Sequence, residues 1–482
     1  RALDALARVA ALQAPSLDGR EVASIAWAFA KMKYENTDMF SVLASVVAAD
    51  MYILNAREIT STVWSFVTVR RNDKELFDTF ARSAISKMED FTQQHIAKTA
   101  WAFAKVGRKD KELFDALAQE AARKMDDFNT QDIANVAWAF ATVGRCDAKL
   151  FDLLSSAVVS KSGMLNAQET ANTLWAFVKV SRNDSLIFLS LRGAAIEKAR
   201  HFNSQNIANT AWAFATAEQT DEVVFDVLAK VARKKIRSFN AQELANTVWA
   251  FAKIGLKDVD AELVRALSHA SVTKMRSFNQ QDIANTACAF AKIGHHDLEL
   301  FNALARAAVS KMRSFSRQHV ANTAWAFAKA ERVDDDLFHA LGRAAIARME
   351  DFNEQDITCT AWALATVDWD DDAELLDALV QAAFAKVSGF NPVELANISW
   401  AFARLSRGDT ELFDVLAVAA VAESCAFSEQ NIANTAWAFA KVGRSDVALF
   451  AALARGAKAQ AGSFSEQNLA NTAWAFSSAF AS

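Results

Sequence analysis

Apolar residues recur along the chain with a helical period, and the whole pattern returns about every 37 residues. Within residues 129–164, Ile133, Ala137 and Phe140 stand at i, i+4 and i+7, a spacing that places them on one face of an α-helix. A second apolar stripe begins at Leu150. Each copy of the pattern is therefore predicted to form two amphipathic helices, neither of which can bury its apolar face alone.

Capping and turn residues predict where the two helices begin and end. Asn129 suits the N-cap of the first helix, and Asp132, three residues later, completes a capping box. Gly144 suits the position just after that helix, where the backbone is often left-handed. Asp147 suits the N-cap of the second helix. Similar residues recur in other copies, so the same helical hairpin is expected throughout.

Tryptophan marks the register of the repeat, and we call residues at one place in successive copies a column. Twelve of the thirteen tryptophans fall in register, and Cys288 takes the place of a missing one. The copies account for residues 1–482, so the sequence predicts an all-α fold, a single α-solenoid of about thirteen tandem 37-residue helical hairpins. We expect the tryptophan and phenylalanine columns to serve packing between hairpins. Because the chain begins and ends inside a copy, it is expected to be a fragment.

Two segments depart from the repeat. Residues 256–264 contain two extra residues, and this insertion precedes Cys288, where a small side chain replaces tryptophan. A packing fault or bend is therefore expected near residues 256–290. Residues 368–374 contain a one-residue insertion and an acidic run around Trp369, the one tryptophan out of register, and we expect them to form an exposed loop.

Composition and motifs weigh against catalysis. Lys and Arg total 52 against 57 Asp and Glu, a formal net charge of −5, and the 52% of hydrophobic residues is typical of a folded chain. The four cysteines form no C-x-x-C pair, and the sequence lacks the phosphate-binding, dinucleotide-binding, zinc-protease and hydrolase motifs. No apolar run reaches the ~18 residues of a membrane span. We therefore expect a non-enzymatic protein with no catalytic residue, metal, cofactor, membrane partner or small-molecule substrate.

The first polar column lies three residues before the tryptophan position. Nine of the thirteen copies have asparagine there, within a helix, where the helix propensity of asparagine is poor. Either the amides bridge neighbouring repeats through hydrogen bonds, or they face a groove and bind an extended polymer. The asparagines are Asn135, Asn172, Asn209, Asn246, Asn285, Asn322, Asn397, Asn434 and Asn471.

The second polar column lies four residues after the tryptophan position and shares a helix face with the asparagines. Eight of its thirteen residues are basic and none is acidic, and the basic ones are Lys31, Lys105, Lys179, Lys253, Lys292, Lys329, Arg404 and Lys441. Cations are favoured at helix C-termini, but an exposed column of this kind would also bind phosphates. Arginines three residues further along would extend such a stripe, and these are Arg71, Arg108, Arg145, Arg182, Arg332, Arg407 and Arg444.

A third column, at the capping-box position six residues before the tryptophan, varies in residue type. Examples are His95, Asp132 and Asn206. In modular RNA-binding proteins, two or three side chains of each helical repeat select one base. The variation therefore fits either a base-reading code or neutral exchange among residues that cap a helix equally well.

The segment Gln242–Lys253 resembles the L-A-N-x-x-W-A core of octotricopeptide repeats. It is also similar to the helical repeats of FAST-kinase-domain-type proteins and of the RNA-editing substrate-binding complex. The resemblance covers essentially the whole chain, and the asparagine and tryptophan columns are the positions that match. It implies an organellar protein, in a mitochondrion or chloroplast, that binds single-stranded RNA and acts in RNA processing, stability or translation. It also allows other RNA-processing proteins as partners.

The RNA-binding hypothesis places phosphates on the basic column and bases on the asparagine amides of one groove. The alternative is an armadillo- or HEAT-like interaction scaffold that binds an extended peptide, since such arrays also carry asparagine and tryptophan on one helix face. A shared, positively charged face would favour RNA. Burial of the two columns in contacts between helices would favour the scaffold.

Overall fold

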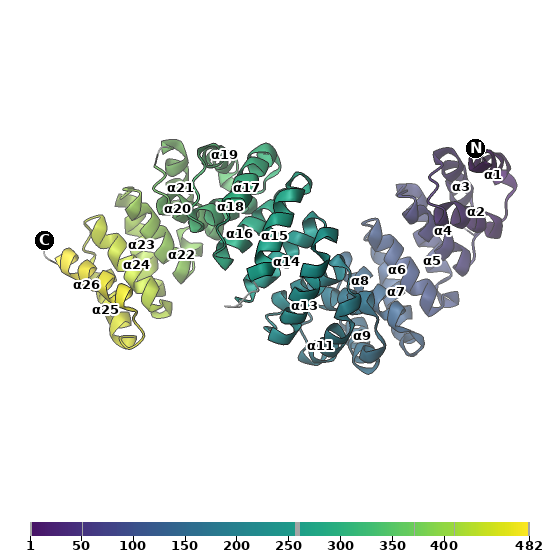
Figure 1. The fold of residues 1–482 in the computed structure, drawn as a ribbon, viewed down its shortest axis with the longest axis horizontal. Coiled ribbons are helices and arrows are strands. Elements are labelled where there is room, and N and C mark those ends of the chain that lie inside the picture. The colour runs from purple at the N-terminus through teal and green to yellow at the C-terminus, as the bar shows by residue number, and fades with distance from the viewer. Residues whose placement is uncertain (1, 51, 256–260, 371, 409, 481–482) are drawn as a thin grey trace. The chain divides into compact units, whose positions relative to one another are not determined.

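A computed structural model describes residues 2–50, 52–255, 261–370, 372–408 and 410–480, and these residues form only helices and the turns between them (Figure 1). Two kinds of helix alternate along the chain, as the repeat predicted. We call the helix that contains the tryptophan column the A helix of a repeat, and the helix that follows it the B helix. The predicted all-α solenoid is thereby confirmed.

Among the described residues there are thirteen A helices and thirteen B helices. The A helices are α2 (Gly19–Lys31), α4 (Ala56–Thr68), α6 (Gln93–Lys105), α8 (Thr130–Thr142), α10 (Ala167–Lys179), α12 (Ser204–Thr216), α14 (Ala241–Lys253), α16 (Gln280–Ile293), α18 (Arg317–Lys329), α20 (Glu354–Thr366), α22 (Pro392–Arg404), α24 (Glu429–Lys441) and α26 (Glu466–Phe480). The B helices are α1 (Ala2–Gln13), α3 (Thr37–Ala49), α5 (Lys74–Ser86), α7 (Lys111–Arg123), α9 (Ala148–Lys161), α11 (Ser185–Lys198), α13 (Glu222–Lys235), α15 (Ala261–Lys274), α17 (Leu298–Lys311), α19 (Asp335–Ile346), α21 (Ala373–Ala385), α23 (Thr410–Glu423) and α25 (Val447–Ala459).

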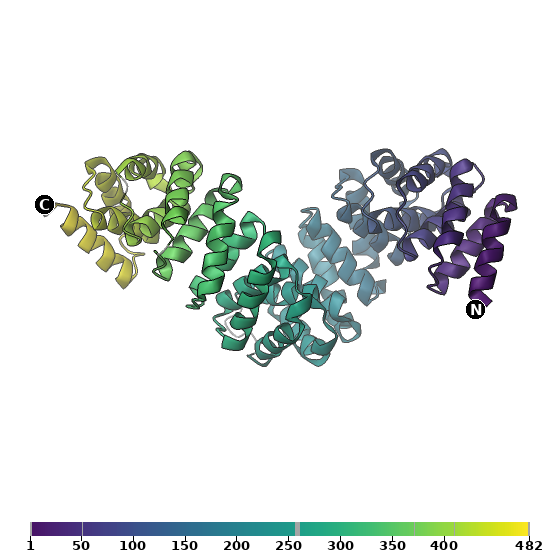
Figure 2. The same ribbon diagram turned by 90° about the horizontal axis from the view of Figure 1, so that it is seen from above.

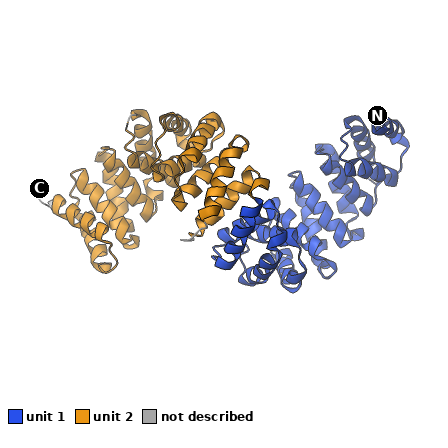
Figure 3. Cartoon of the chain, viewed as in Figure 1, with its two compact units in different colours: residues 1–235 blue, residues 236–482 orange. Residues whose placement is uncertain are grey.

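The chain divides into two compact units, residues 1–235 and residues 236–482 (Figure 3). Within each unit, every A helix packs against the next A helix and every B helix against the next B helix, as in stacked hairpins (Figure 2). The A helices approach one another more closely than the B helices do. Small side chains permit this approach, since alanines such as Ala137 and Ala139 are fully buried beside the tryptophan position.

Phenylalanine columns build the core between the two layers of helices. Phe140 of α8 and Phe114 of α7 are fully buried, and their ring centroids lie 5.2 Å apart in an edge-to-face arrangement. Ile133 and Leu150 are also fully buried. Because α7 belongs to the preceding repeat, the aromatic contact joins one repeat to the next. The predicted packing role of the phenylalanine column is confirmed.

The tryptophan column lies outside this core. Trp138, Trp175 and Trp212 are only partly buried. The ring centroids of Trp138 and Trp175 are 6.5 Å apart, and those of Trp175 and Trp212 are 6.4 Å apart. The tryptophans therefore contact one another between successive hairpins, as expected, but they do so at the surface and not in the core between the two layers. Phe140, two residues after Trp138, points about 200° away around the helix, so only one of the two columns can face the core.

Reciprocal capping boxes begin the A helices. In α8, the Asn129 side chain accepts a hydrogen bond from the backbone N–H of Asp132 (2.9 Å), and the Asp132 carboxylate accepts one from the backbone N–H of Asn129 (3.4 Å). Every A helix from α2 to α22 has such a box. The predicted helix starts are therefore confirmed, and each box satisfies two backbone donors that the helix itself cannot.

Left-handed residues end the A helices from α2 to α24. Gly144 (φ 75°) adopts this conformation as expected, but Ser181 (φ 59°) and Glu331 (φ 54°) adopt it as well. In α8 the turn is closed by a hydrogen bond from the Arg145 N–H to the Phe140 carbonyl (2.9 Å). Seven of these twelve repeats form the turn without glycine, so contacts made by the residues that follow must help to hold it.

The predicted packing fault near residues 256–290 falls partly on residues 256–260, which lie outside the described residues. The helix that carries Cys288 is α16, and it packs against α14 and α18 as closely as other A helices pack against their neighbours. A fault within residues 256–260 stays a prediction.

The acidic segment 368–374 is only partly the exposed loop that was expected. Asp368 and Asp370 are exposed, Asp371 lies outside the described residues, and α21 begins at Ala373. Trp369, however, is only 8% exposed, and its ring centroid lies 5.3 Å from that of Phe338. The prediction is wrong for Trp369, whose indole packs against the preceding B helix.

Candidate nucleic-acid interface

The asparagine column lies on the solvent-facing side of the A helices. All nine asparagines, from Asn135 in α8 to Asn471 in α26, are partly exposed. Asn471 accepts a hydrogen bond from Gln467 Nε2 (3.0 Å). The side-chain amides of the other eight make no hydrogen bond with any residue that the structure describes. The interpretation that these amides bridge neighbouring repeats therefore has no support in the described contacts.

The indoles of neighbouring repeats lie beside the asparagines in each unit, with their ring planes tilted by 33–40° to one another. In unit 2, the ring centroids of Trp325 and Trp362 are 6.4 Å apart, and those of Trp400 and Trp437 are 6.5 Å apart. These tryptophans are partly exposed. Such rings offer flat apolar surfaces on which bases or aliphatic side chains can stack.

The basic column lies at the C-terminal end of the same helix faces. Its exposed members are Lys31, Lys105, Lys179, Lys253, Lys292, Lys329, Arg404 and Lys441. Lys253 Nζ lies 5.5 Å from the ring centroid of Trp249 in its own helix, and Lys292 Nζ lies 5.8 Å from that of Trp325 in the next repeat. These cation–π contacts hold the ammonium groups near the indoles while leaving the side chains exposed.

Arg404 differs from the lysines of this column. Its Nε and one terminal nitrogen each lie 3.0 Å from a carboxylate oxygen of Asp368, and its guanidinium lies 5.5 Å from the ring centroid of Trp400. Because Asp368 balances its charge, we expect Arg404 to contribute less to anion binding than the lysines do.

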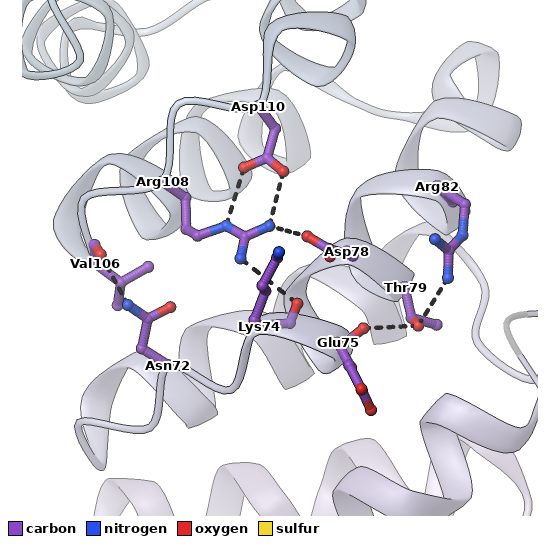
Figure 4. A network of polar contacts seen from close by, with 9 residues as sticks. All are labelled: Asn72, Lys74, Glu75, Asp78, Thr79, Arg82, Val106, Arg108 and Asp110. Atoms are coloured by element: carbon purple, nitrogen blue, oxygen red, sulfur yellow. Dashed lines mark hydrogen bonds and ion pairs between the residues drawn. The ribbon is translucent and has the colours of Figure 1, made fainter.

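The arginine column that was expected to extend the basic column joins repeats instead (Figure 4). Arg108 donates hydrogen bonds to both carboxylate oxygens of Asp110 (3.1 and 2.9 Å) and to Asp78 on the preceding B helix. The bond to Asp110 is the main reason that the pKa of Arg108 is raised. The same pairing with an aspartate thirty residues earlier is made by Arg145, Arg182, Arg407 and Arg444. Arg71 pairs with Asp73 of its own turn, and Arg332 donates to the backbone carbonyl of His296. The expectation that this column binds phosphates is therefore wrong for the five arginines that an aspartate of the preceding repeat neutralises.

Two aromatic residues occupy the same column as these arginines. The Tyr34 hydroxyl donates to Asp4, thirty residues earlier. The ring centroid of Trp369 lies 5.0 Å from that of His339, also thirty residues earlier. Trp369 therefore replaces an ion pair by an aromatic contact at an equivalent junction, which explains why it is buried.

A further basic column, which the sequence analysis missed, joins repeats in a second way. Lys161 at the end of α9 donates a hydrogen bond to the backbone carbonyl of Phe128 (2.5 Å), just before α8. Equivalent bonds to the preceding repeat are made by Lys87, Lys124, Lys235, Lys274, Lys311 and Lys386. The signal was present in the sequence, because a lysine recurs at the end of most second helices.

The side chains of the variable capping-box column take part in the caps at the start of the A helices. Asp132 and Asp282 are only 4% and 5% exposed, and burial raises the pKa of both carboxyl groups. His319 Nδ1 accepts a hydrogen bond from the backbone N–H of Ser316 (3.2 Å), and burial lowers the pKa of this imidazole. These contacts favour interchangeable capping residues over a base-reading code.

A column of glutamines, four residues before the asparagines, was also missed. Ten repeats have it, and all ten side chains are exposed: Gln94, Gln131, Gln168, Gln205, Gln242, Gln281, Gln318, Gln355, Gln430 and Gln467. In α8, Gln131, Asn135, Trp138 and Thr142 stand at i, i+4, i+7 and i+11, so the four columns share one face of the helix. We call the surface formed by the glutamine, asparagine, tryptophan and basic columns the A face.

In the described ranges, no group of three or more His, Cys, Asp and Glu side chains is arranged to hold a metal ion. No described helix is both long enough and apolar enough to cross a membrane.

Comparisons with known proteins point to one family. The family model described as RNA-editing substrate-binding complex 6 protein matches residues 2–185 and 178–409. No curated protein sequence matches the chain. A homology model of the full-length AP-3 complex in an intermediate open conformation aligns with 98% of this chain and 89% of its own (9% identity, TM-score 0.36). A circular tandem repeat protein with novel repeat topology and enhanced subunit contact surfaces aligns with 98% of this chain and 96% of its own (12% identity, TM-score 0.16). Neither structural likeness is close enough to bear on function.

Proposed function

The chain belongs to the RNA-editing substrate-binding complex 6 family, and from this premise we propose that it binds single-stranded RNA along the A face of its repeats. The observation that carries the proposal is the contrast among the three basic columns. In two of them, most side chains are bonded to carboxylates or carbonyls of the preceding repeat. The third, which contains Lys105 and Lys179, is exposed on the same helix face as the partly exposed asparagine amides and indoles.

The chemistry of the A face suits an unpaired strand. Ammonium groups at the C-terminal ends of the A helices attract phosphates. Indoles stack with bases whatever their identity. Asparagine and glutamine amides both donate and accept hydrogen bonds, so they suit base edges and ribose hydroxyls. A net charge of −5 is compatible with this, because binding depends on the local field at the surface.

We infer a non-enzymatic role in RNA processing, stability or translation, with other RNA-processing proteins as partners. The family description supports work within an RNA-editing substrate-binding complex. It favours the mitochondrion as the compartment, with the chloroplast as the alternative that follows from the resemblance to octotricopeptide repeats.

The alternative function is an armadillo- or HEAT-like scaffold that binds an extended peptide. The partly exposed amides of the asparagine column would form hydrogen bonds with a peptide backbone as well as with a nucleotide. The exposed lysines would then require an acidic peptide, so a peptide rich in aspartate and glutamate is the appropriate competitor.

The proposal is tested by titrating fluorescent single-stranded RNA of random sequence at several salt concentrations. We expect binding at ~50 mM salt that weakens steeply as salt rises. Replacing Lys105→Glu together with Lys179→Glu should weaken binding and lower the salt slope by about two, one for each lost phosphate contact.

The matched control is Lys111→Glu together with Lys149→Glu, which changes the net charge equally but alters exposed lysines of the B helices α7 and α9. This control should bind RNA nearly as the parent does. An equal loss of RNA affinity in both variants would mean that the total charge of the protein decides affinity. Absence of binding at ~50 mM salt by a fully helical protein, with binding of the acidic peptide instead, would establish the scaffold function.

A further inference from the structure

We propose that the A face binds single-stranded RNA without regard to base sequence, each repeat making the same set of contacts. This inference rests on the proposed function and specifies the substrate class. It depends on which positions of the repeat vary, which are exposed, and which are occupied by contacts within the protein.

Three of the four columns that form the A face are nearly uniform, and the fourth, the basic column, contacts phosphates, which carry no sequence information. Glutamine occupies its column in ten of thirteen repeats, asparagine in nine and tryptophan in twelve. A modular reader needs side chains that change from repeat to repeat, because each repeat must prefer a different base. A face that presents the same amides and indole in most repeats offers every base the same partners.

The exceptions do not supply a code. In the first three repeats, Arg20 and Arg57 replace glutamine and Lys98 replaces asparagine, and all three side chains are exposed. Cations at these positions add attraction for phosphates, which carry no sequence information. Other exceptions, such as Ser24 and Ser61, have small polar side chains.

The column that does vary forms the helix caps from α2 to α22; six of its members are buried, although Glu21 is exposed and His95 is half-buried. Asn206 is 3% exposed, and its Oδ1 accepts a hydrogen bond from the backbone N–H of Asn203 (3.2 Å). Asp132 makes the equivalent bond in α8 and is 4% exposed. Reading a base with these side chains would require breaking the caps, which would leave backbone donors at the helix start without partners.

The test is a set of unstructured RNAs of about 20 nucleotides that share one base composition in different orders, a length above the ~13 bases that thirteen repeats would cover at one base each. We expect their dissociation constants to agree within about threefold at one salt concentration. For a base-reading array, the dissociation constants of such RNAs would differ by about tenfold or more, since each correctly read base changes affinity by about that factor. One order bound at least tenfold more tightly than the rest would overturn the inference.

Two variants test whether single positions of the repeat change the rank order of the RNA affinities. Asn206→Asp exchanges one natural capping residue for another and should leave the relative affinities of the RNAs unchanged, whereas a code would shift the preference at one base. Gln131→Ala with Asn135→Ala should weaken every RNA by a similar factor. A change in rank order in either variant would contradict sequence-independent binding. Failure of all the RNAs to bind at ~50 mM salt would instead contradict the proposed function.

Discussion

At the scale of single residues, the capping-box carboxylates combine two opposing effects. A negative charge near a helix N-terminus is favourable, but Asp282 is 5% exposed, and burial raises the pKa of its carboxyl group above its ordinary value. Burial therefore outweighs the hydrogen bond from the Asn279 N–H and the charge of Lys311, both of which lower this pKa. The asparagine at the same place in α12, Asn206, avoids this cost because an amide needs no charge to accept the capping hydrogen bond.

We predict that Asp282→Asn stabilises the protein at neutral pH. Because the folded pKa is raised, the carboxyl group contributes stability fully below pH 3.8 and loses that contribution as pH rises through the folded pKa. The stability difference between variant and parent should therefore grow as pH rises from about 4 to 7. Chemical denaturation at several pH values measures this difference. A difference independent of pH would mean that the carboxylate is not penalised by burial.

At the scale of the helix, the left-handed residue that ends an A helix shows how contacts with a neighbouring repeat act against a backbone preference. Ser181 (φ 59°) ends α10 in the conformation that Gly144 (φ 75°) adopts after α8. The left-handed region disfavours residues that have a Cβ atom. The residue that follows each of them is an arginine, Arg182 or Arg145, and both arginines pair with an aspartate of the preceding repeat. The ion pair helps to maintain a turn that serine alone would not favour.

We predict that Ser181→Gly stabilises the end of α10 by about 1 kcal/mol, because glycine removes the steric cost of the left-handed backbone. Hydrogen exchange of amides near the end of α10 should slow by about fivefold. The converse change, Gly144→Ser, should accelerate exchange at the end of α8 by a similar factor. Unchanged exchange in both variants would show that the neighbouring contacts, rather than the backbone preference, control this turn.

At the scale of the whole chain, stability is distributed over junctions between neighbouring repeats. Most junctions within the units contain an edge-to-face phenylalanine pair, and many contain an ion pair or a lysine bonded to a backbone carbonyl. Since each repeat contacts only its neighbours within a unit, the loss of one junction should have local consequences.

We predict that Lys311→Met destabilises its own junction by about 1–3 kcal/mol, because the carbonyl of Phe278 loses a charged hydrogen-bond donor. Hydrogen exchange should accelerate in α14 to α17 and remain unchanged in α6 to α9. The control is Lys329→Met, an exposed lysine of the A face, which should leave exchange unchanged throughout. Acceleration over the whole chain would mean that the repeats unfold as one cooperative unit.

Much of the fold followed from the sequence because the signals are local. The spacing of Ile133, Ala137 and Phe140 defined a helix, and Asn129 with Asp132 defined its start. Repetition then extended one hairpin to the whole array. The glutamine column was equally visible in the sequence and was missed only because its exposure was not considered.

Tertiary structure alone decided which polar side chains remain available. Arg145 and Lys179 are both basic residues near the end of an A helix, yet Arg145 pairs with Asp115, thirty residues away, while Lys179 is exposed. Whether a cation is neutralised depends on the carboxylate or carbonyl that a stacked neighbour presents. Trp369 was misjudged for the same reason, because its partners belong to another helix. The sequence by itself determined period, helix boundaries and caps, which depend on neighbours along the chain; the surface open to a ligand depends on neighbours in space.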